Sequence, residues 1–251
     1  MSARPLARSI PLAAVLATVL LGGCGGGAAV QQVRVLQMNP GALVSKQARS
    51  SGSTVVRASL SGGSAQLPPA MGVPQVGSVA VGATNGGRLV KGLQLPETGP
   101  DWVTYDPILH RVPNRSDRLW ATDRLLAFLL YVLRDYRLAN PGAPPVVIGD
   151  LSRPRGGPFG NEFGGLGHAS HQNGLDVDVY YPRTDRTQQP PTEVAQVDRA
   201  LAQDLVGRFV GAGALRTFVG ETVGLGGPAP VVQAIPYHDD HVHVRIANVR
   251  E

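Results

Sequence analysis

Two short segments in which apolar and polar residues alternate constrain the fold of this chain more than any other feature. They read GLDVDVYY, residues 174–181, and HVHVRI, residues 241–246. Strict alternation is typical of a half-buried β-strand, because successive side chains point to opposite faces of a sheet. The valines then face a core, and the other face carries Asp176 and Asp178 in the first segment and His241, His243 and Arg245 in the second. If the two strands are neighbours in one sheet, these acid and imidazole groups converge.

Histidine is scarce in this sequence, and its placement indicates a metal site. Five of the six histidines lie in GHASHQNG or HDDHVHVR, at positions 168, 171, 238, 241 and 243. His171 stands just before the turn at residues 173–174, which can fold it back over the polar face of the first strand. One carboxylate and two imidazoles are a typical catalytic zinc set, with the fourth position left for water. Cys24 is the only cysteine, so a metal in the rest of the chain must be held by His, Asp or Glu.

Helices are expected beside this sheet. Ser116 can cap a helix that runs to about Leu138, and residues 140–142, Asn-Pro-Gly, stop it. Thr192 can cap a second helix that runs through about Phe209. Further strands are expected in PPVVIGD and LRTFVG, and residues 152–167, rich in Gly, Pro and Arg, are expected to form a loop. Helices on one side of a mostly antiparallel sheet predict an α+β domain.

The first residues resemble the export signal of a bacterial lipoprotein. Arg4 and Arg8 precede an apolar run over residues 10–21, which is too short for a membrane span of about 20 residues. The run closes in LLGGC, which resembles a lipobox, and this implies that residues 1–23 are removed and that Cys24 carries the lipid anchor. The alternative is an ordinary secretory signal in which Cys24 is incidental. The chain is therefore expected to be exported and lipid-anchored to the membrane that faces the cell wall or periplasm.

Residues 24–84 are expected to form a disordered tether between that anchor and a domain over residues 85–251. The segment consists largely of Gly, Ser, Ala, Val and Gln, and it cannot bury enough apolar surface to offset the ordering of its backbone. Residues 1–100 carry eight Lys or Arg and one acid, a balance that suits an anionic membrane surface or wall polymers. No nucleic-acid partner is expected, because the charges are scattered and no aromatic residues lie between them.

The motifs together resemble a known group of enzymes. The spacing His171-x6-Asp178 and His241-x-His243 is similar to that of the LAS peptidases, the lysostaphin, D-Ala-D-Ala metallopeptidase and hedgehog group. The ordered series NGGRLVKGLQLP, IGDLSRPRGGPFG, GHASHQNGLDVDVYY and H-x-x-H-x-HVR resembles the penicillin-insensitive murein endopeptidases over about residues 84–250. The alternative, structural or surface histidines, would have to account for five residues at the spacing of one family.

The resemblance implies a role for each histidine of the cluster. Zinc would be the cofactor, held by His171, Asp178 and His243. His241 would be the catalytic histidine that assists water or stabilises the transition state. His238 would join it at the catalytic site, and His168 would line that site.

Three other residues have open roles. Asp176 either orients a ligand imidazole from behind or is a solvent-facing acid. Arg153 and Arg155 either hold a substrate carboxylate in a bidentate fork or are solvated loop arginines.

The resemblance also implies the substrate, the D-alanyl to meso-diaminopimelate cross-link between peptidoglycan peptides. Cleavage without serine acylation would make such an enzyme insensitive to penicillin. A zinc carboxypeptidase that trims a terminal D-alanine, and a non-catalytic zinc-stabilised wall-binding lipoprotein, remain alternatives. An unknown regulator is expected, because uncontrolled wall hydrolysis is harmful, although no residue indicates one. Residues 210–237, rich in Gly and Pro, cannot be aligned with the family and are a candidate for the cleft wall that sets bond specificity.

Overall fold

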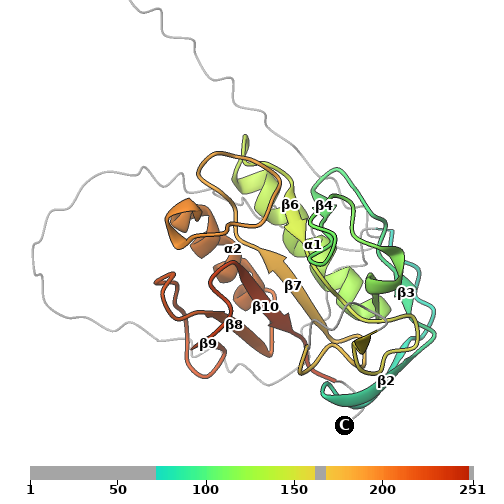
Figure 1. Ribbon diagram of the computed structural model, residues 1–251. Helices are drawn as coiled ribbons and strands as arrows, with labels where there is room; N and C mark the ends of the chain where they lie inside the picture. Colours follow the sequence, from blue (N-terminus) through green and yellow to red (C-terminus); the bar gives the residue numbers. More distant parts are fainter. Residues whose placement is uncertain (1–71, 162–167, 249–251) are drawn as a thin grey trace, which may run out of the picture. The chain divides into compact units, whose positions relative to one another are not determined.

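The computed structural model describes residues 72–161 and 168–248 (Figure 1). The predicted signal peptide, Cys24 and most of the predicted tether lie outside these residues. Within the described part, no helix is both long and apolar enough to pass through a membrane.

A six-stranded sheet forms the centre of the domain. In spatial order its strands are β4 (Trp102–Thr104), β6 (Val146–Ile148), β7 (Asp176–Tyr180), β10 (His241–Arg245), β8 (Arg216–Gly220) and β9 (Val232–Ile235). The three inner pairings are antiparallel, and the outer pairs β4–β6 and β8–β9 are parallel. The expected α+β fold with a mostly antiparallel sheet is confirmed, and both alternating segments are strands of this sheet.

Two helices pack together on one face of the sheet, α1 (Asp123–Ala139) and α2 (Arg199–Gly211) (Figure 1). Phe128 and Phe209 stack between them with ring centroids 5.9 Å apart. Four leucines of α1 (125, 126, 129 and 133) and the valines of β7 and β10 belong to one buried apolar cluster. Complete burial of such a side chain contributes about 1.5–3 kcal/mol, so this face supplies most of the apolar stabilisation of the domain.

The first helix begins later than the sequence indicated. Thr122, not Ser116, is its N-cap, and the Thr122 hydroxyl accepts a hydrogen bond from the backbone N–H of Leu125 at 3.1 Å. Ser116 instead opens a single 3-10 turn, η1 (Ser116–Arg118). The residues between them form β5 (Trp120–Ala121), which pairs with β3 (Leu93–Gln94). Strand pairing thus removes these residues from the helix that their apolar spacing predicted. The expected end of the helix is confirmed, because α1 stops at Ala139.

The second helix also begins later than predicted. Asp198 caps α2 by accepting a hydrogen bond from the N–H of Leu201 at 3.1 Å. Thr192 lies in the preceding loop, where its N–H and hydroxyl both donate to the side chain of Gln196. That loop contains the short turn η3 (Val194–Gln196). The threonine therefore forms a local side-chain contact instead of a helix cap.

A β-hairpin precedes the expected start of the domain. It consists of β1 (Val79–Ala83) and β2 (Gly86–Val90), so its first strand lies in the segment assigned to the tether. Asn173 donates to the carbonyl of Gly82 at 2.8 Å, and the N–H of Gln172 donates to the carbonyl of Thr84 at 3.0 Å. These bonds fix the tip of the hairpin beside the loop that carries His171.

Candidate metal centre

The register of β7 and β10 brings the polar groups of both strands together. The strands are antiparallel, and Asp178 lies opposite His243, Asp176 opposite Arg245, and Tyr180 opposite His241. The predicted convergence of acid and imidazole groups is confirmed. The prediction that β7 is half-buried is wrong, because all five of its residues are buried. The residues that contact its polar face include His168 and His171 of the loop before the strand.

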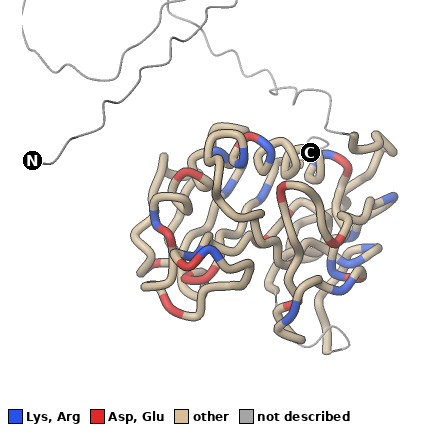
Figure 2. Tube along the Cα trace, turned by 90° about the horizontal axis from the view of Figure 1, so that it is seen from above, with Lys and Arg blue, Asp and Glu red and all other residues tan. Residues whose placement is uncertain are grey.

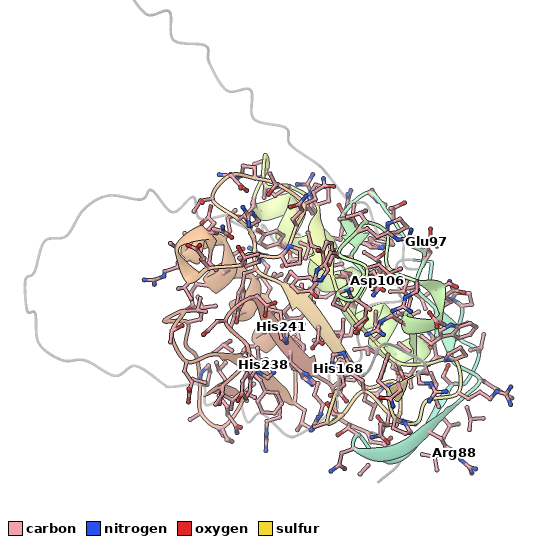
Figure 3. The ribbon with its side chains drawn as sticks, viewed as in Figure 1. Arg88, Glu97, Asp106, His168, His238 and His241 are labelled. Carbon is pink, nitrogen blue, oxygen red and sulfur yellow. The ribbon has the colours of Figure 1, made fainter. Side chains whose placement is uncertain are left out.

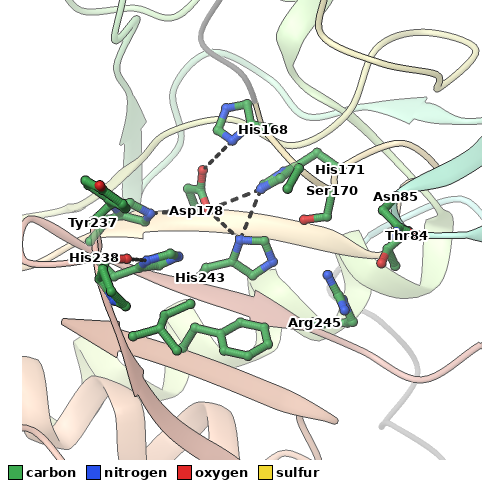
Figure 4. Close-up of a pocket in the computed structure, with 15 residues that line it drawn as sticks. Thr84, Asn85, His168, Ser170, His171, Asp178, Tyr237, His238, His243 and Arg245 are labelled. Atoms are coloured by element: carbon green, nitrogen blue, oxygen red, sulfur yellow. Dashed lines mark hydrogen bonds and ion pairs between the residues drawn. The ribbon is translucent and has the colours of Figure 1, made fainter. Parts of the chain in front are cut away.

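Three donor atoms form a nearly equilateral triangle at the centre of this face (Figure 4). Nε2 of His171 lies 3.3 Å from Oδ1 of Asp178, Nδ1 of His243 lies 3.2 Å from the same oxygen, and the two nitrogens are 3.3 Å apart. Tetrahedral zinc with bonds of about 2.0–2.2 Å places neighbouring ligand atoms about 3.3 Å apart. The triangle therefore has the edge length that zinc coordination requires.

The remaining ring nitrogens fix how the two imidazoles are oriented. Nδ1 of His171 contacts the carbonyl of Leu151 at 2.6 Å, and Nε2 of His243 contacts Oδ1 of Asp176 at 2.9 Å. Because a carbonyl and a carboxylate accept, these nitrogens carry protons, and in the neutral rings the nitrogens that face Asp178 are lone pairs that a metal can bind. Oδ1 of Asp178 is buried and has no hydrogen-bond partner among the described residues. These residues fit a metal cation, which is the partner that the three donors lack.

Asp176 orients the ligands from behind. Its side chain is fully buried, and in addition to His243 it accepts from the backbone N–H of His171 at 3.2 Å and from Nε of Arg245 at 2.6 Å. His171 has a left-handed backbone, with φ at +67°, which is uncommon for a residue other than glycine. Of the two roles left open for Asp176, the structure supports the orienting one, since the carboxylate does not face solvent.

Electrostatics keep the donors in a form suited to a cation. Burial lowers the pKa of His171, which favours the neutral imidazole that a metal binds. Burial alone would raise the pKa of Asp178, but the imidazoles of His171 and His241 outweigh it, and the pKa lies well below its usual range. Burial would also lower the pKa of His243, but Asp176 and Asp178 raise it to about 9. In the metal-free protein, a proton and a metal therefore compete for His243.

The other three histidines of the cluster, His168, His238 and His241, lie close to one another (Figure 3) and to the triangle. Nε2 of His241 lies 3.7 Å from Oδ1 of Asp178, and its Nδ1 contacts Asp240 at 2.6 Å. The ring of His238 lies 4.7 Å from that of His241. Nδ1 of His168 lies 3.5 Å from Oδ2 of Asp178, and His168, His171 and Asp178 form a second set of groups close enough to share a metal. The sequence thus identified every histidine that the structure places here.

A buried ion pair behind His168 was not anticipated. Asp150 contacts Nε2 of His168 at 2.7 Å and accepts from Nε of Arg118 at 2.7 Å, and both members of this ion pair are almost completely buried. Arg118 also lies 4.9 Å from the ring of Phe159, which contacts His168 edge-on. An acid two residues after the buried strand VVI was the available signal for Asp150. Nothing in the local pattern distinguished Arg118, which stood inside a predicted helix.

A cavity of about 630 Å³ opens over the triangle (Figure 4). Its walls come from the hairpin tip, the histidine loops, Phe218 of β8, and residues 235–238. Gly220 lets the last of these walls approach the sheet, because a Cβ there would lie 2.2 Å from the side chain of Asp239. Part of the segment that could not be aligned therefore does form a wall of the site.

The two candidate substrate-binding arginines lie apart from this wall. Neither Arg153 nor Arg155 is among the described residues that line the cavity, and Arg153 donates to the carbonyl of Pro158 at 2.6 Å. A substrate-binding role for them stays a prediction. Arg245, which the alternation placed on the polar face without a role, does line the cavity.

Comparison with known proteins agrees with this geometry. The sequence pattern of the penicillin-insensitive murein endopeptidases matches residues 80–210, just over half of the chain. The match includes His168, His171 and Asp178 but ends before the other three histidines of the site. The register of β10 against β7 is what adds those histidines to the matched segment.

Several curated proteins named penicillin-insensitive murein endopeptidase are similar to this chain. One from Escherichia coli strain SE11 is 33% identical over 131 residues, which are 51% of this chain and 40% of that protein. Those from Escherichia coli O157:H7 and Citrobacter koseri are each 45% identical over 74 residues, 29% of this chain and 23% of theirs. The aligned part of this chain thus spans less than half the length of each of these relatives. The match over residues 80–210 nevertheless shows that this chain belongs to the penicillin-insensitive murein endopeptidase family.

Proposed function

We propose that this protein is a zinc-dependent endopeptidase that hydrolyses peptide cross-links of bacterial peptidoglycan. The observation that carries the proposal is the donor triangle of His171, Asp178 and His243, with edges of 3.2–3.3 Å and an unpartnered buried carboxylate oxygen. The family gives the substrate class, since its members are named for the cleavage of murein.

The residues around the triangle suit hydrolysis of an amide. A zinc ion bound there would polarise the scissile carbonyl and acidify a water molecule. His241 directs Nε2 toward the triangle, while Asp240 holds its Nδ1. Burial would lower the pKa of His241, but Asp178 and Asp240 outweigh burial and raise it. His241 is therefore suited to hold a proton and donate it to the leaving amine.

His238 adds a second imidazole on the same side. Burial lowers its pKa, so its ring is neutral near pH 7, and Nδ1 contacts the carbonyl of Pro236 at 2.7 Å. A neutral imidazole held in this way presents Nε2 as an acceptor. We assign His238 to accept a hydrogen bond from the reacting groups, beside the proton donor His241.

The cellular setting follows from the sequence of residues 1–24. We propose that the enzyme is exported and anchored through Cys24 to the membrane facing the wall, with the segment up to the β1–β2 hairpin as a tether. The anchor would restrict hydrolysis to wall within reach of that membrane.

The test uses the full chain in detergent and purified cross-linked muropeptide dimers. We expect one tightly bound zinc ion per chain, conversion of dimers to monomers that stops with a chelator, and loss of that conversion in His241→Ala with zinc still bound. Release of D-alanine from intact dimers would instead establish a carboxypeptidase. Zinc binding without any cleavage would establish a wall-binding protein and reject the proposal.

A further inference from the structure

The cavity over the triangle adjoins a second one. The second cavity, of about 590 Å³, lies beside residues 189–194 and shares one wall residue with the first, Tyr237. Tyr237 is 94% exposed and has a left-handed backbone, with φ at +63°. The two cavities are thus neighbours that meet at Tyr237. We treat them as two parts of one binding surface and call the first, at the hairpin tip, the hairpin arm and the second the acidic arm.

The hairpin arm carries a cation. Arg245 lines it, two residues along β10 from His243, beside Thr84 and Asn85 of the hairpin tip. Arg245 uses only Nε to bind Asp176, at 2.6 Å, and its guanidinium lies 5.8 Å from the ring of Phe218. Its two terminal nitrogens have no hydrogen-bond partner among the described residues. They present the donor pair that binds a carboxylate in a bidentate fork.

The acidic arm carries the opposite charge. Glu193, Asp239 and Asp240 line it, and no Lys or Arg is among its described lining residues. Asp240 uses Oδ1 to hold His241, and Asp239 uses Oδ1 to accept from the N–H of Thr222 at 3.1 Å. Their other oxygens and the carboxylate of Glu193 have no hydrogen-bond partner among the described residues. In the described chain as a whole, acidic and basic residues are interspersed (Figure 2), so this separation by sign is a property of the binding surface.

Tyr180 is independent evidence that the acidic arm takes a ligand. Its side chain lines this arm, the residue is only 7% exposed, and its ring packs edge-on against Tyr105 at 5.7 Å. Its hydroxyl has no hydrogen-bond partner among the described residues and is free to bond to a ligand in the arm. A polar ligand in the arm would supply the partner.

We propose that these arms fix the direction of the bound cross-link, with a carboxylate at Arg245 and an ammonium group at Glu193, Asp239 and Tyr180. The inference rests on the proposed function. In a D-alanyl to diaminopimelyl cross-link, the carbon attached to the scissile nitrogen carries a carboxylate. The diaminoacid residue on the acyl side of the D-alanine carries a free amino group on its side chain.

The dimensions of β10 agree with this arrangement. Positions 241, 243 and 245 lie on one face of the strand. Each is about 7 Å from the next along the strand, since a strand rises about 3.4 Å per residue. The donor triangle at His243 thus has the cation on one side and His241, followed by the acids, on the other. The carboxylate beside the scissile nitrogen then extends toward Arg245 and the diaminoacid residue of the acyl side toward the acidic arm, while the scissile nitrogen itself stays at the triangle, on the same face as His241.

The experiment measures binding by the metal-free full chain, so that no dimer is consumed. Three dimers are compared by calorimetry: the native one, one acetylated on its free amino group, and one amidated at the carboxylate beside the scissile nitrogen. We expect each modification to weaken binding about tenfold, the effect of one charge-assisted contact worth about 1.4 kcal/mol. Arg245→Gln should lose the sensitivity to amidation and keep the sensitivity to acetylation. The double variant Glu193→Gln, Asp239→Asn should show the reverse.

Controls separate this inference from effects on folding and from the proposed function. Glu221→Gln changes an exposed acid outside both arms and should bind like the wild type. A purely structural role for Arg245 would weaken all three dimers equally and would overturn the inference. Dimers that are cleaved by the zinc-loaded enzyme but bind without regard to either modification would also overturn it, and the proposed function would stand. A chain that neither binds nor cleaves dimers would reject the proposed function itself.

Discussion

The two faces of β7 and β10 share one backbone but carry side chains of opposite chemistry. On one face, the valines 177, 179, 242 and 244 are completely buried against α1 and α2. On the other, Asp176, Asp178 and His243 are almost equally buried, without any helix of the described chain over them. The apolar face needs only volume and contact, whereas every polar group on the other face needs a partner in a defined direction.

The difference teaches that burial has two origins in this domain. The apolar face is buried because burial stabilises it. The polar face is buried because a histidine loop and the hairpin tip cover it, at a desolvation cost that hydrogen bonds and the proposed zinc ion would offset. Substitutions on the two faces should therefore affect different measurements.

The largest contrast is expected between neighbouring residues of β7. Asp178→Asn removes a proposed zinc ligand, and metal assistance worth several kcal/mol corresponds to a loss of activity of about a thousandfold or more. Val177→Ala should lower the free energy of unfolding by about 2 kcal/mol and leave the activity per folded molecule unchanged. Zinc content, dimer cleavage and urea denaturation measure the three quantities. Normal zinc content and cleavage in Asp178→Asn would remove this residue from the site.

The next contrast compares a buried with an exposed ion pair. Arg118→Met removes the arginine partner of the buried Asp150, which keeps its contacts with His168 and Asn114, and should cost about 3–5 kcal/mol of stability. Arg183→Met breaks the pair with Asp185, whose side chain is 46% exposed, and should cost less than about 1 kcal/mol. Equal costs in denaturant titrations would show that the Arg118 pair does not act as a buried one.

Asp176 tests how strongly the orienting shell supports the ligands. Asp176→Asn keeps the size of the side chain but weakens its contacts with His243 and Arg245. Zinc affinity should fall about 10- to 100-fold, as for other carboxylates behind a ligand histidine. Competition with a fluorescent chelator measures it. An unchanged affinity would show that the Leu151 and Asp178 contacts orient the imidazoles without help.

The free energy of unfolding is expected to depend on pH through Asp150, by about 2 kcal/mol. Burial would raise its pKa, but His168 and Arg118 outweigh burial and lower the pKa to about 2, from 3.8. Because the pKa is lowered by folding, the ionised Asp150 stabilises the folded state fully above about pH 4, and this stabilisation is lost as the pH falls toward 2. The total change in the free energy of unfolding is about 2 kcal/mol. The pH dependence of unfolding should be correspondingly shallower in Asp150→Asn than in the wild type. Identical slopes would assign the acid sensitivity to other carboxylates.

The smallest contrast concerns the apolar face. Thr122→Ala removes the cap of α1 and its bond to the carbonyl of Gly174, and should cost about 1 kcal/mol. Ser116→Ala, at the cap position that the sequence indicated, should lower the stability by less than about 0.5 kcal/mol. Thermal unfolding of both variants decides between the two positions.

Sequence reasoning succeeded where a local pattern carries the information. Alternation placed Asp178 and His243 on the shared polar face, and spacing identified the histidines, because strand geometry is nearly invariant. It failed where distant pairing decides. Thr122 caps α1 because the residues before it pair with β3, and β1 is a strand because the loop of Asn173 holds its hairpin. Asp150 lacked a visible partner because Arg118 is 32 residues away in the sequence.

The valine pairs of β7 and β10 have a consequence for folding. Val177 lies opposite Val244 and Val179 opposite Val242, so a slip of two residues would again place valine against valine. The hydrophobic pattern excludes a slip of one residue but not of two. The native alignment differs from the slipped ones in pairing Asp176 with Arg245 and in holding three donors at the spacing of a zinc ion. Because a metal that binds only the native alignment favours it by mass action, zinc present during refolding should select the correct pairing of these strands.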